Sequence, residues 1–281
     1  MILVFGKTGQ VATELARFDA VKTLGRDQAD LSDPAACADA IRAHAPAAVI
    51  NAAAYTAVDA AEENEALATV INGDAPGAMA RACVDLGIPF VTISTDYVFS
   101  GDGHAPWRPT DPVAPLGAYG RSKLVGERAV LDAGGTAAIL RTSWVFSAHG
   151  NNFVKTMLRL GAERDALNIV ADQIGGPTAA GDIAQTCITM AKALIDNPSA
   201  PALYHYAGAP DASWADFARA IFDMSGIECA VTDIASSAYP TPAMRPKNSR
   251  LDCSTLAQTF GIDRPDWQIS LRSVLTDLKA I

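Results

Sequence analysis

The chain has 281 residues, of which 49% are hydrophobic and 19% charged, and its formal net charge is −9 at pH 7. This length and composition suit one or two compact domains with a full hydrophobic core. The acidic balance argues against a nucleic-acid-binding surface, and no apolar run approaches the ~20 residues that a membrane span needs.

The cysteine and histidine pattern bounds the function further. The five cysteines are scattered without a Cys-xx-Cys pair, and the four histidines are dispersed. This argues against a disulfide framework and predicts no metal site. The chain begins Met1-Ile-Leu-Val-Phe5 without the basic and long apolar regions of a secretory signal. We therefore expect a cytoplasmic protein.

The first predicted element is a short apolar strand, Ile2 to Phe5, followed by the turn Gly6-Lys-Thr-Gly9-Gln-Val-Ala12 and a helical pattern. A strand, a glycine-rich turn and a helix in this order are typical of the phosphate-binding start of a dinucleotide fold. Gly6 permits the tight turn, and Gly9 lets the backbone approach a pyrophosphate. The spacing departs from the commoner Gly-x-Gly-xx-Gly, so the turn alone is a weak signal.

Short apolar strands and helices then alternate along the chain. Further strands are expected at Val21 to Leu24, Ala47 to Ile50, Phe90 to Ile93 and Ala137 to Leu140, with helices at Pro34 to His44 and at Leu67 to Leu86, the latter interrupted at Gly73 and Pro76. This alternation predicts an α/β fold with a doubly wound parallel sheet of the Rossmann type. Ligands bind at the carboxyl ends of such strands, so Gly9, Ala54 and Thr95 are expected on one rim.

Beyond about residue 165 the expected elements become shorter and more mixed. A helix at Asn151 to Arg164 precedes them. The later elements are helices at Asp182 to Ile195 and Trp214 to Met224, a turn at Gln173 to Thr178, a strand at Leu203 to Tyr206, and an extended segment at Tyr239 to Arg250. We predict a nucleotide-binding domain over residues 1–165 and a smaller mixed α/β substrate lobe over residues 166–281. The boundary is approximate, with room for the chain to cross between lobes.

A Tyr-xxx-Lys pair follows a long loop rich in glycine and proline. Tyr119 and Lys123 are four residues apart, which places them on one face of a helix. An ammonium beside a phenol is expected to lower the phenol pKa from its usual ~10, so that the tyrosine can donate a proton to a developing alkoxide. An exposed helix with a solvated lysine is the alternative when the spacing is taken alone.

More specific motifs run along almost the whole chain. They are Phe5-Gly-Lys-Thr-Gly-Gln10, Asn51-Ala-Ala-Ala-Tyr-Thr-Ala-Val-Asp59, Ser94-Thr-Asp-Tyr-Val-Phe99, Tyr119-Gly-Arg-Ser-Lys-Leu-Val-Gly-Glu127, Arg141-Thr-Ser-Trp-Val-Phe146, Gly150-Asn-Asn-Phe153, Asp172-Gln-Ile-Gly-Gly-Pro-Thr178, Tyr239-Pro-Thr-Pro-Ala243, Arg245-Pro246 and Asn248-Ser-Arg-Leu251. With these motifs the chain resembles the extended short-chain dehydrogenase/reductases, and among them the dTDP-4-dehydrorhamnose reductases. The resemblance implies NADPH- or NADH-dependent reduction of the C4 ketone of dTDP-4-dehydro-L-rhamnose to dTDP-L-rhamnose.

The resemblance also implies roles for individual residues. The catalytic residues are Thr95, which hydrogen-bonds the substrate carbonyl, Tyr119, the proton donor, and Lys123, which lowers the donor's pKa and holds the nicotinamide ribose. The cofactor-binding residues are Gly6, Gly9, Gln10, Val11, Arg26, Asp30, Leu31, Ala54, Tyr55, Thr56, Tyr119 and Lys123. The substrate-binding residues are Thr95, Asp96, Trp144, Asn152, Arg245 and Arg250. The alternatives are a strand-capping role for Thr95 and core packing for Trp144.

Two departures from the usual pattern bear on the ligands. Many dinucleotide folds carry an acidic residue after the second strand, which repels a 2′-phosphate, whereas this chain has Gly25 and Arg26 there, with Asp27 close by. NADPH is therefore expected to be accepted. Some relatives bind Mg²⁺ between subunits through glutamates; Glu14 matches one of these, but Gly181 stands where another would be. A shared Mg²⁺ site is therefore doubtful, and a homodimer stays open.

Two rival functions stay open at this point. A sugar-nucleotide dehydratase usually carries an Asp-Glu pair after the threonine, whereas Asp96 is followed here by Tyr97, and an epimerase shares the same fold. A non-catalytic regulatory subunit also resembles this family. Apart from these, Arg245, Lys247 and Arg250 lie on a proline-stiffened segment. At least one of them, with Arg245 first, is expected to meet the diphosphate of a dTDP-sugar, and a solvated basic loop is the alternative.

Overall fold

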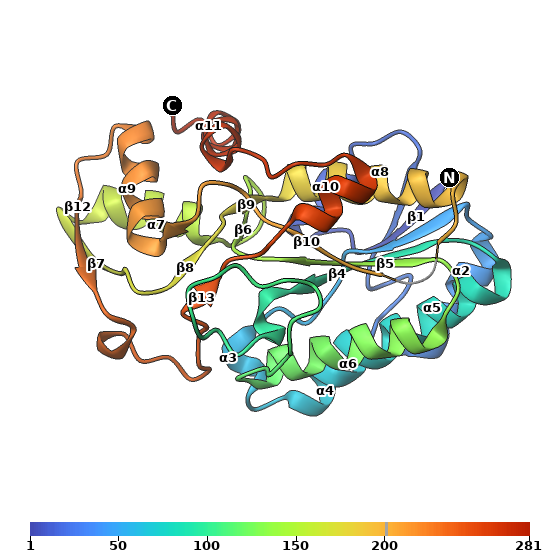
Figure 1. Cartoon of the computed structure of the whole chain (residues 1–281). Helices are drawn as coiled ribbons and strands as arrows, with labels where there is room; N and C mark the ends of the chain where they lie inside the picture. Colours follow the sequence, from blue (N-terminus) through green and yellow to red (C-terminus); the bar gives the residue numbers. More distant parts are fainter. Residues whose placement is uncertain (200–201) are drawn as a thin grey trace.

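A computed structural model of the chain describes residues 1–199 and 202–281 (Figure 1). Its centre is a six-stranded sheet in the order β10-β5-β4-β3-β1-β2, and every neighbouring pair in it is parallel. The strands are β1 Ile2–Phe5, β2 Val21–Leu24, β3 Ala48–Asn51, β4 Phe90–Thr95, β5 Ala137–Thr142 and β10 Ala202–Tyr206. The predicted doubly wound parallel sheet is confirmed.

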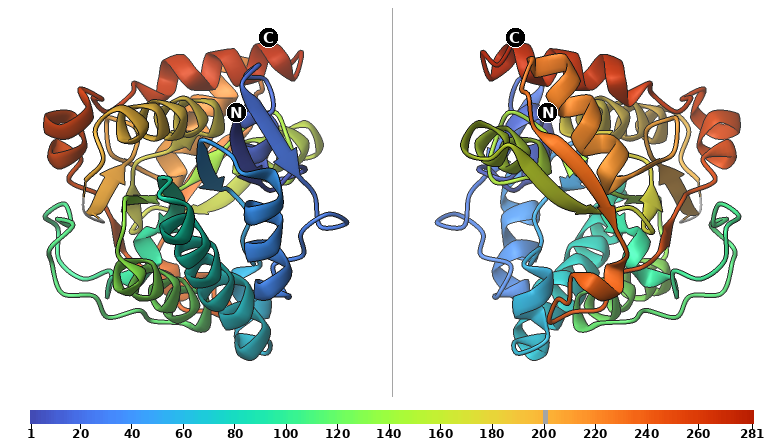
Figure 2. Two further views of the ribbon diagram at one scale, coloured as in Figure 1. Left: turned by 90° about the vertical axis from the view of Figure 1, so that its right-hand side faces the viewer. Right: turned by 90° about the vertical axis from the view of Figure 1, so that its left-hand side faces the viewer.

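Helices cover both faces of this sheet, as Figures 1 and 2 show. The helices α1 Gln10–Leu15 and α8 Ala180–Asp196 pack on one face, and α2 Pro34–His44, α5 Ala75–Leu86 and α6 Ala118–Ala133 form the layer on the other. Because the sheet is covered on both sides, its inner strands are buried along nearly their whole length, and their polar residues gather towards the carboxyl ends.

The strand order places a crevice above β1. The chain runs from β1 to β2 on one side and then returns to place β3 on the other side of β1. At such a reversal the neighbouring loops diverge, and ligands bind outside the carboxyl ends of the strands.

The long helix expected from Leu67 to Leu86 is interrupted by a π-helical turn. It consists of α4 Glu65–Thr69, the π turn η1 Val70–Asp74, and α5. Pro76 comes just after the π turn, and Ala75 N, directly before it, still donates to Val70 O. The irregularity expected near Gly73 and Pro76 is therefore present without a break in the chain's direction.

A smaller part of the molecule is built on a separate hydrophobic cluster. It contains α7 Phe153–Glu163, α9 Trp214–Ser225 and α11 Trp267–Asp277, beside the paired strands β7 Ala166–Val170 and β12 Ala230–Ile234. These two strands and α11 were not predicted, although Asp266, the N-cap of α11, was a sequence signal for that helix.

Short strands and one-turn helices connect the two parts. The region expected as a turn, Gln173 to Thr178, contains β8 Ile174–Gly175 and the start of β9 Thr178–Ala179, so that expectation is wrong in part. The remaining short elements are α3 Val58–Ala61, η2 Asp96–Val98, β6 Val145–Phe146, β11 Ala212–Ser213, η3 Ser236–Ala238 and β13 Asn248–Ser249. Because each strand is only two residues long, tertiary pairing and not local pattern decides whether it forms.

The chain crosses back to the large sheet after residue 165. Helix α8, strand β10 and helix α10 Ser254–Phe260 contribute Ile183, Tyr204 and Leu256 to the hydrophobic cluster of the sheet. The boundary near residue 165 stays a prediction, and the later residues are shared between the two parts. Within the described residues, no helix combines the length and hydrophobicity that crossing a bilayer requires.

Candidate functional site

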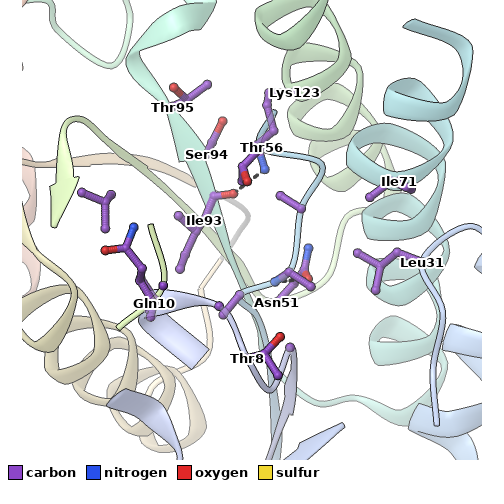
Figure 3. Close-up of a pocket in the computed structure, with 18 of the residues that line it drawn as sticks. Thr8, Gln10, Leu31, Asn51, Thr56, Ile71, Ile93, Ser94, Thr95 and Lys123 are labelled. Carbon is purple, nitrogen blue, oxygen red and sulfur yellow. Dashed lines mark hydrogen bonds between the residues drawn. The ribbon is translucent and has the colours of Figure 1, made fainter. Parts of the chain in front are cut away.

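A cavity of about 1010 Å³ opens above the carboxyl ends of β1, β3 and β4. Its walls come from the glycine-rich turn, the loops after these strands, and the start of α6 (Figure 3). The predicted site residues that line it are Gly6, Gly9, Gln10, Val11, Arg26, Asp30, Leu31, Ala54, Thr56, Thr95, Asp96, Tyr119, Lys123 and Trp144. Residues that are far apart in the sequence thus share one cavity.

The glycine-rich turn shapes the wall next to β1. Gly6 has φ +114°, and a Cβ there would lie 3.1 Å from the Cβ of Ala12 and 3.3 Å from the backbone of Ala52. A side chain at this position is therefore excluded both by conformation and by space. Gly9 is the N-cap of α1, and its φ of −70° is one that any residue can adopt. The turn therefore does not require glycine here; instead, the missing side chain lets a ligand in the cavity come close to the backbone.

Charges of both signs surround the turn after β2. Arg26 lines the cavity with its side chain 81% exposed, and its Nε lies 3.8 Å from Asp30 Oδ2. Lys7, which sequence reasoning did not single out, also lines the cavity, and its Cδ would be 3.3 Å from a Cβ at Gly25. The Asp27 side chain also folds towards Gly25, and its Oδ1 lies 2.5 Å from the place that a Cβ of residue 25 would occupy. The expected cation is thus present, together with an acid that opposes a 2′-phosphate.

A buried asparagine holds the loop that follows β3. Asn72, in the π turn, accepts a hydrogen bond from Tyr55 N at 2.8 Å and donates to Tyr55 O at 3.0 Å and to Ser122 Oγ at 2.9 Å. The wall carrying Ala54 and Thr56 is therefore tied to helix α6. The irregularity near Gly73 was the only sequence signal for this function of the π turn.

Lys123 projects from α6 towards β4. It is 5% exposed, and its Nζ donates a hydrogen bond to the backbone oxygen of Ile93 at 2.7 Å (Figure 3). Burial lowers the pKa of Lys123 to about 8, and the charge of Glu127 opposes this effect. An ammonium is thus held at the edge of the cavity, next to the end of β4.

Tyr119 lies one helical turn before Lys123 on α6 and lines the same cavity. Burial and the charge of Asp96 raise the pKa of Tyr119 to about 12, and hydrogen bonding to Thr95 opposes the rise. The expectation that Lys123 lowers this pKa is wrong for the arrangement seen here, because the Lys123 ammonium is directed to Ile93 O. The phenol is therefore a protonated donor at neutral pH.

Thr95 and Asp96 complete this end of the cavity at the close of β4. Thr95 donates to Asp96 Oδ1 at 3.1 Å and accepts a hydrogen bond from Tyr97 N at 3.2 Å. Burial raises the pKa of Asp96 to about 6, against hydrogen bonds from Ser249 and Thr95. Asp96 Oδ2 and Thr142 Oγ1 are buried without a hydrogen-bond partner among the described residues, and both side chains border the cavity. Unpaired buried polar atoms are costly, which marks this wall as one built to meet a polar ligand.

An aromatic pair bounds the cavity on the side of the smaller part. Trp144 has φ +51° and stacks on Trp214, with ring centroids 3.6 Å apart. A Cβ at Gly175 would lie 2.9 Å from the Trp144 ring, so glycine makes room for the indole. A left-handed backbone at a bulky residue is strained and is found where the surrounding structure enforces it. Trp144 is thus both packed against Trp214 and part of the cavity wall, so its role in binding stays a prediction.

Comparisons with known proteins agree with this geometry. The family described as RmlD substrate binding domain matches residues 1–280. A dTDP-4-dehydrorhamnose reductase of Sinorhizobium fredii (strain NBRC 101917 / NGR234) is 45% identical over 284 residues, covering 98% of this chain and 96% of the relative. The chain belongs to the dTDP-4-dehydrorhamnose reductase family.

Solved structures of the family have the same fold over the whole chain. The dTDP-4-dehydrorhamnose reductase of Clostridium acetobutylicum ATCC 824 is 36% identical, with a TM-score of 0.90 over 99% of both chains. The dTDP-4-dehydrorhamnose reductase of Bacillus anthracis str. Ames, solved in complex with NADP, is 32% identical, with a TM-score of 0.91 over 98% of both chains. The cofactor of this reductase fold is accordingly NAD(P)H, and the cavity walls at Gly9, Leu31 and Thr56 offer it a site.

Four residues predicted for this reductase's site do not line the cavity: Tyr55, Asn152, Arg245 and Arg250. The backbone of Tyr55 is hydrogen-bonded to Asn72. Asn152 is the N-cap of α7; it accepts a hydrogen bond from Lys155 N at 3.2 Å and donates one to Gln10 Oε1 at 3.1 Å. The two predicted arginines are paired with carboxylates: Arg245 with Asp59 at 2.8 Å and Arg250 with Asp211 at 3.6 Å. Lys247 likewise faces Asp172 at 3.3 Å.

The region around Glu14 holds an ion pair in this reductase. Glu14 faces His149 at 3.0 Å and Arg17 at 3.0 Å, and a Cβ at Gly181 would lie 3.9 Å from its carboxyl group. Glu14 and Gly181 are therefore neighbours in space, and of these two positions only Glu14 carries a carboxylate. In the described part of the chain, no three His, Cys, Asp or Glu side chains gather to hold a metal ion.

Proposed function

We propose that Thr95, Tyr119 and Lys123 are the catalytic residues of the reaction for which this family is named. The reaction is the NAD(P)H-dependent reduction of the C4 ketone of dTDP-4-dehydro-L-rhamnose to dTDP-L-rhamnose. The observation that carries this assignment is the convergence of a hydroxyl, a phenol and an ammonium at one end of the cavity, although they come from two elements, β4 and α6.

The reduced nicotinamide, when bound, supplies the hydride that is added to the ketone carbon. Tyr119 donates its phenolic proton to the carbonyl oxygen, which becomes the alcohol; with its pKa near 12 in this structure, the phenol is fully protonated beforehand. Thr95 orients the same oxygen by turning its hydroxyl proton from Asp96 Oδ1 to it. Lys123, whose ammonium is directed to Ile93 O, holds the nicotinamide ribose.

The other predicted cofactor contacts follow the cavity from β1 towards β2. Gly6 and Gly9 leave space for the pyrophosphate, and Gln10 and Val11 begin the helix whose first N–H groups have no helical partner. Arg26 and Asp30 lie at the adenosine end with Leu31. We assign the adenine to the apolar wall of Leu31 and Ile71, which face each other in Figure 3.

The substrate-binding assignments divide into two groups. Asp96 and Trp144 line the cavity next to Tyr119, which supports direct contact with the sugar. Arg245 binds Asp59 through Nη2, and its Nη1, which has no partner among the described residues, is the atom that we assign to the dTDP diphosphate. Arg250 pairs with Asp211 and would share it with, or exchange it for, the diphosphate. Asn152 acts through Gln10. We also propose that the protein is cytoplasmic and forms a homodimer, in accordance with a sugar-nucleotide pathway and the family's architecture.

A turnover assay tests this function directly. The protein, NADPH and dTDP-4-dehydro-L-rhamnose are expected to give stoichiometric NADPH oxidation and dTDP-L-rhamnose. An epimerase would produce an isomer without net NADPH consumption, and a regulatory subunit would bind the ligands without turnover. Either result would overturn the assignment.

A further inference from the structure

A buried ion pair lies directly behind the proposed catalytic residues. Glu127 of α6 and Arg141 of β5 are 3% and 2% exposed, and two parallel hydrogen bonds join them, Nε to Oε1 at 2.8 Å and Nη2 to Oε2 at 2.6 Å. Neither side chain lines the cavity. A pair this deeply buried is weak evidence for stability as such, because desolvation of two charges offsets much of their attraction.

Glu127 and Lys123 bind adjacent residues of the same strand. Lys123 Nζ donates to Ile93 O at 2.7 Å, and Ser94 Oγ donates to Glu127 Oε1 at 2.6 Å. Lys123 and Glu127 are four residues apart on α6, so the two contacts repeat one helical turn apart. Together they fix the rotation and the height of α6 against the end of β4, which carries Thr95.

Arg141 also contacts His205 and Phe99, on the side that does not bind Glu127. Its Nη1 faces His205 Nε2 at 3.4 Å, and its guanidinium lies over the Phe99 ring at 4.9 Å from the centroid. Burial and the charge of Arg141 lower the pKa of His205 to about 3, so this histidine is neutral. Because its Nδ1 lies 2.9 Å from Trp107 O, we assign the proton to Nδ1, which leaves Nε2 to accept from Arg141.

We propose that Glu127, clamped by Arg141 and Ser94, is the positioning residue that sets the Lys123 ammonium and the start of α6 against the end of β4. The proposal rests on the proposed catalytic function of Lys123. Glu127 does not touch the cavity, so it acts on the reaction through Lys123 and through the orientation of the helix that also carries Tyr119.

The charges around Lys123 make this role measurable. Of the described charged side chains, Glu127 is the one that raises the pKa of Lys123 against the effect of burial. Asp96, at the end of β4, acts on Tyr119, and the charge of Arg141 on β5 is compensated by Glu127. His205 on β10 is neutral. Removal of the Glu127 charge should therefore lower the pKa of Lys123 further.

The test compares pH–rate profiles of Glu127→Gln with those of the unchanged protein. We expect kcat to fall and the basic limb of its pH profile to move down by about one unit, the size typical for loss of a neighbouring charge. The affinity for NADPH near pH 6, where Lys123 stays protonated, should change less than kcat does near pH 8. A uniform loss of rate at all pH values, with the basic limb unmoved, would overturn the proposal.

A double variant separates positioning from folding. Glu127→Gln with Arg141→Met removes both buried charges, so its thermal stability and the position of the basic limb should recover relative to Glu127→Gln, while kcat at the pH optimum stays low because the clamp between α6 and β5 is gone. If the double variant regains the original kcat, the pair is structural only and the proposal fails. This variant also carries the test if Glu127→Gln alone does not fold.

The matched control is Glu65→Gln. Glu65 forms an ion pair with Arg121 of α6 at 2.7 Å, but both side chains are more than 40% exposed. The same substitution there should leave the pH profile unchanged, and a shift equal to that of Glu127→Gln would show that any charge near α6 suffices. Absence of turnover in the unchanged protein would contradict the proposed function itself, and so is distinguishable from failure of the inference about Glu127.

Discussion

The two ends of the cavity are built in different ways. The cofactor end is made of short consecutive stretches that follow strand ends, such as Gly6 to Val11 and Ala52 to Thr56. The substrate end brings together β4, the strained Trp144 and, outside the cavity wall, a segment from Tyr239 to Arg250 that comes from the last sixth of the chain. One end is therefore encoded locally, and the other depends on long-range packing.

The treatment of charge differs in the same way. At the cofactor end Lys7 and Arg26 border the cavity, and Arg26 is 81% exposed with its Nε 3.8 Å from Asp30 Oδ2. Near the substrate end, Arg245, Lys247 and Arg250 are each matched to a carboxylate from elsewhere in the chain, at 2.8, 3.3 and 3.6 Å. The cations near the substrate end are therefore held more closely by carboxylates, although Arg245 Nη1 keeps no partner among the described residues.

The largest effect is expected where the two ends meet, at Tyr119. Tyr119→Phe removes the proton donor but keeps the ring, so turnover should fall by about 10²–10⁴-fold while the dissociation constant for NADPH hardly changes. Steady-state rates and a cofactor titration measure the two quantities. A variant that keeps more than about half of the original rate would exclude Tyr119 as the donor.

The next effect concerns stability against pH at Asp96. Its pKa is raised from 3.8 to about 6, so the folded state binds this proton more tightly than the unfolded state. Stability should therefore fall as pH rises from about 4 to about 6, by roughly 3 kcal/mol at most for such a shift. Asp96→Asn should remove this pH dependence and raise stability at pH 7, while it lowers turnover. Denaturant titrations from pH 4 to pH 7 measure the free energy of unfolding of the unchanged protein and of Asp96→Asn. The same pH dependence in the two proteins would contradict the raised pKa of Asp96.

A smaller effect is expected for Arg245 at the substrate end. Its Nη1 is buried without a partner among the described residues, while Nη2 binds Asp59 at 2.8 Å. If Arg245 meets the diphosphate, Arg245→Ala should raise KM for the sugar nucleotide by about tenfold, as expected for loss of a charge-assisted hydrogen bond. Affinity for NADPH should stay constant.

The control for this prediction is Arg159→Ala, because Arg159 pairs with Glu163 at 3.2 Å on the exposed side of α7. No change in either constant is expected there. If Arg245→Ala, Lys247→Ala and Arg250→Ala all keep the sugar-nucleotide KM within about twofold of the original, the smaller part does not bind the diphosphate in this way.

The smallest effect is expected in the choice of cofactor. Arg26 and Lys7 favour a 2′-phosphate, whereas Asp27 folds over Gly25 and opposes it, so the two influences offset each other. We expect kcat/KM for NADPH to be at least equal to that for NADH, and Arg26→Ala to lower the NADPH value alone, by less than about tenfold. A preference for NADH above about tenfold in the unchanged protein would show that Asp27 dominates.

Local pattern was sufficient for the central sheet and for most of the cofactor end. The apolar strands, the turn at Gly6 and the spacing of Tyr119 and Lys123 are set by residues close together in the chain, and each is present in the structure. The two-residue strands β8, β9 and β13 were not predictable in this way, because they exist only through pairing with distant segments.

The sequence by itself thus determined the parallel α/β sheet through its hydrophobic periodicity, and the family through motifs whose residues lie close together in the chain, because both are local properties. Tertiary structure decided which of the predicted site residues reach the cavity and in which state. Burial beside Asp96, and not the neighbouring ammonium, sets the pKa of Tyr119. Likewise, Arg245 and Arg250 are held by Asp59 and Asp211, because burial and pair distances arise only when segments far apart in sequence pack together.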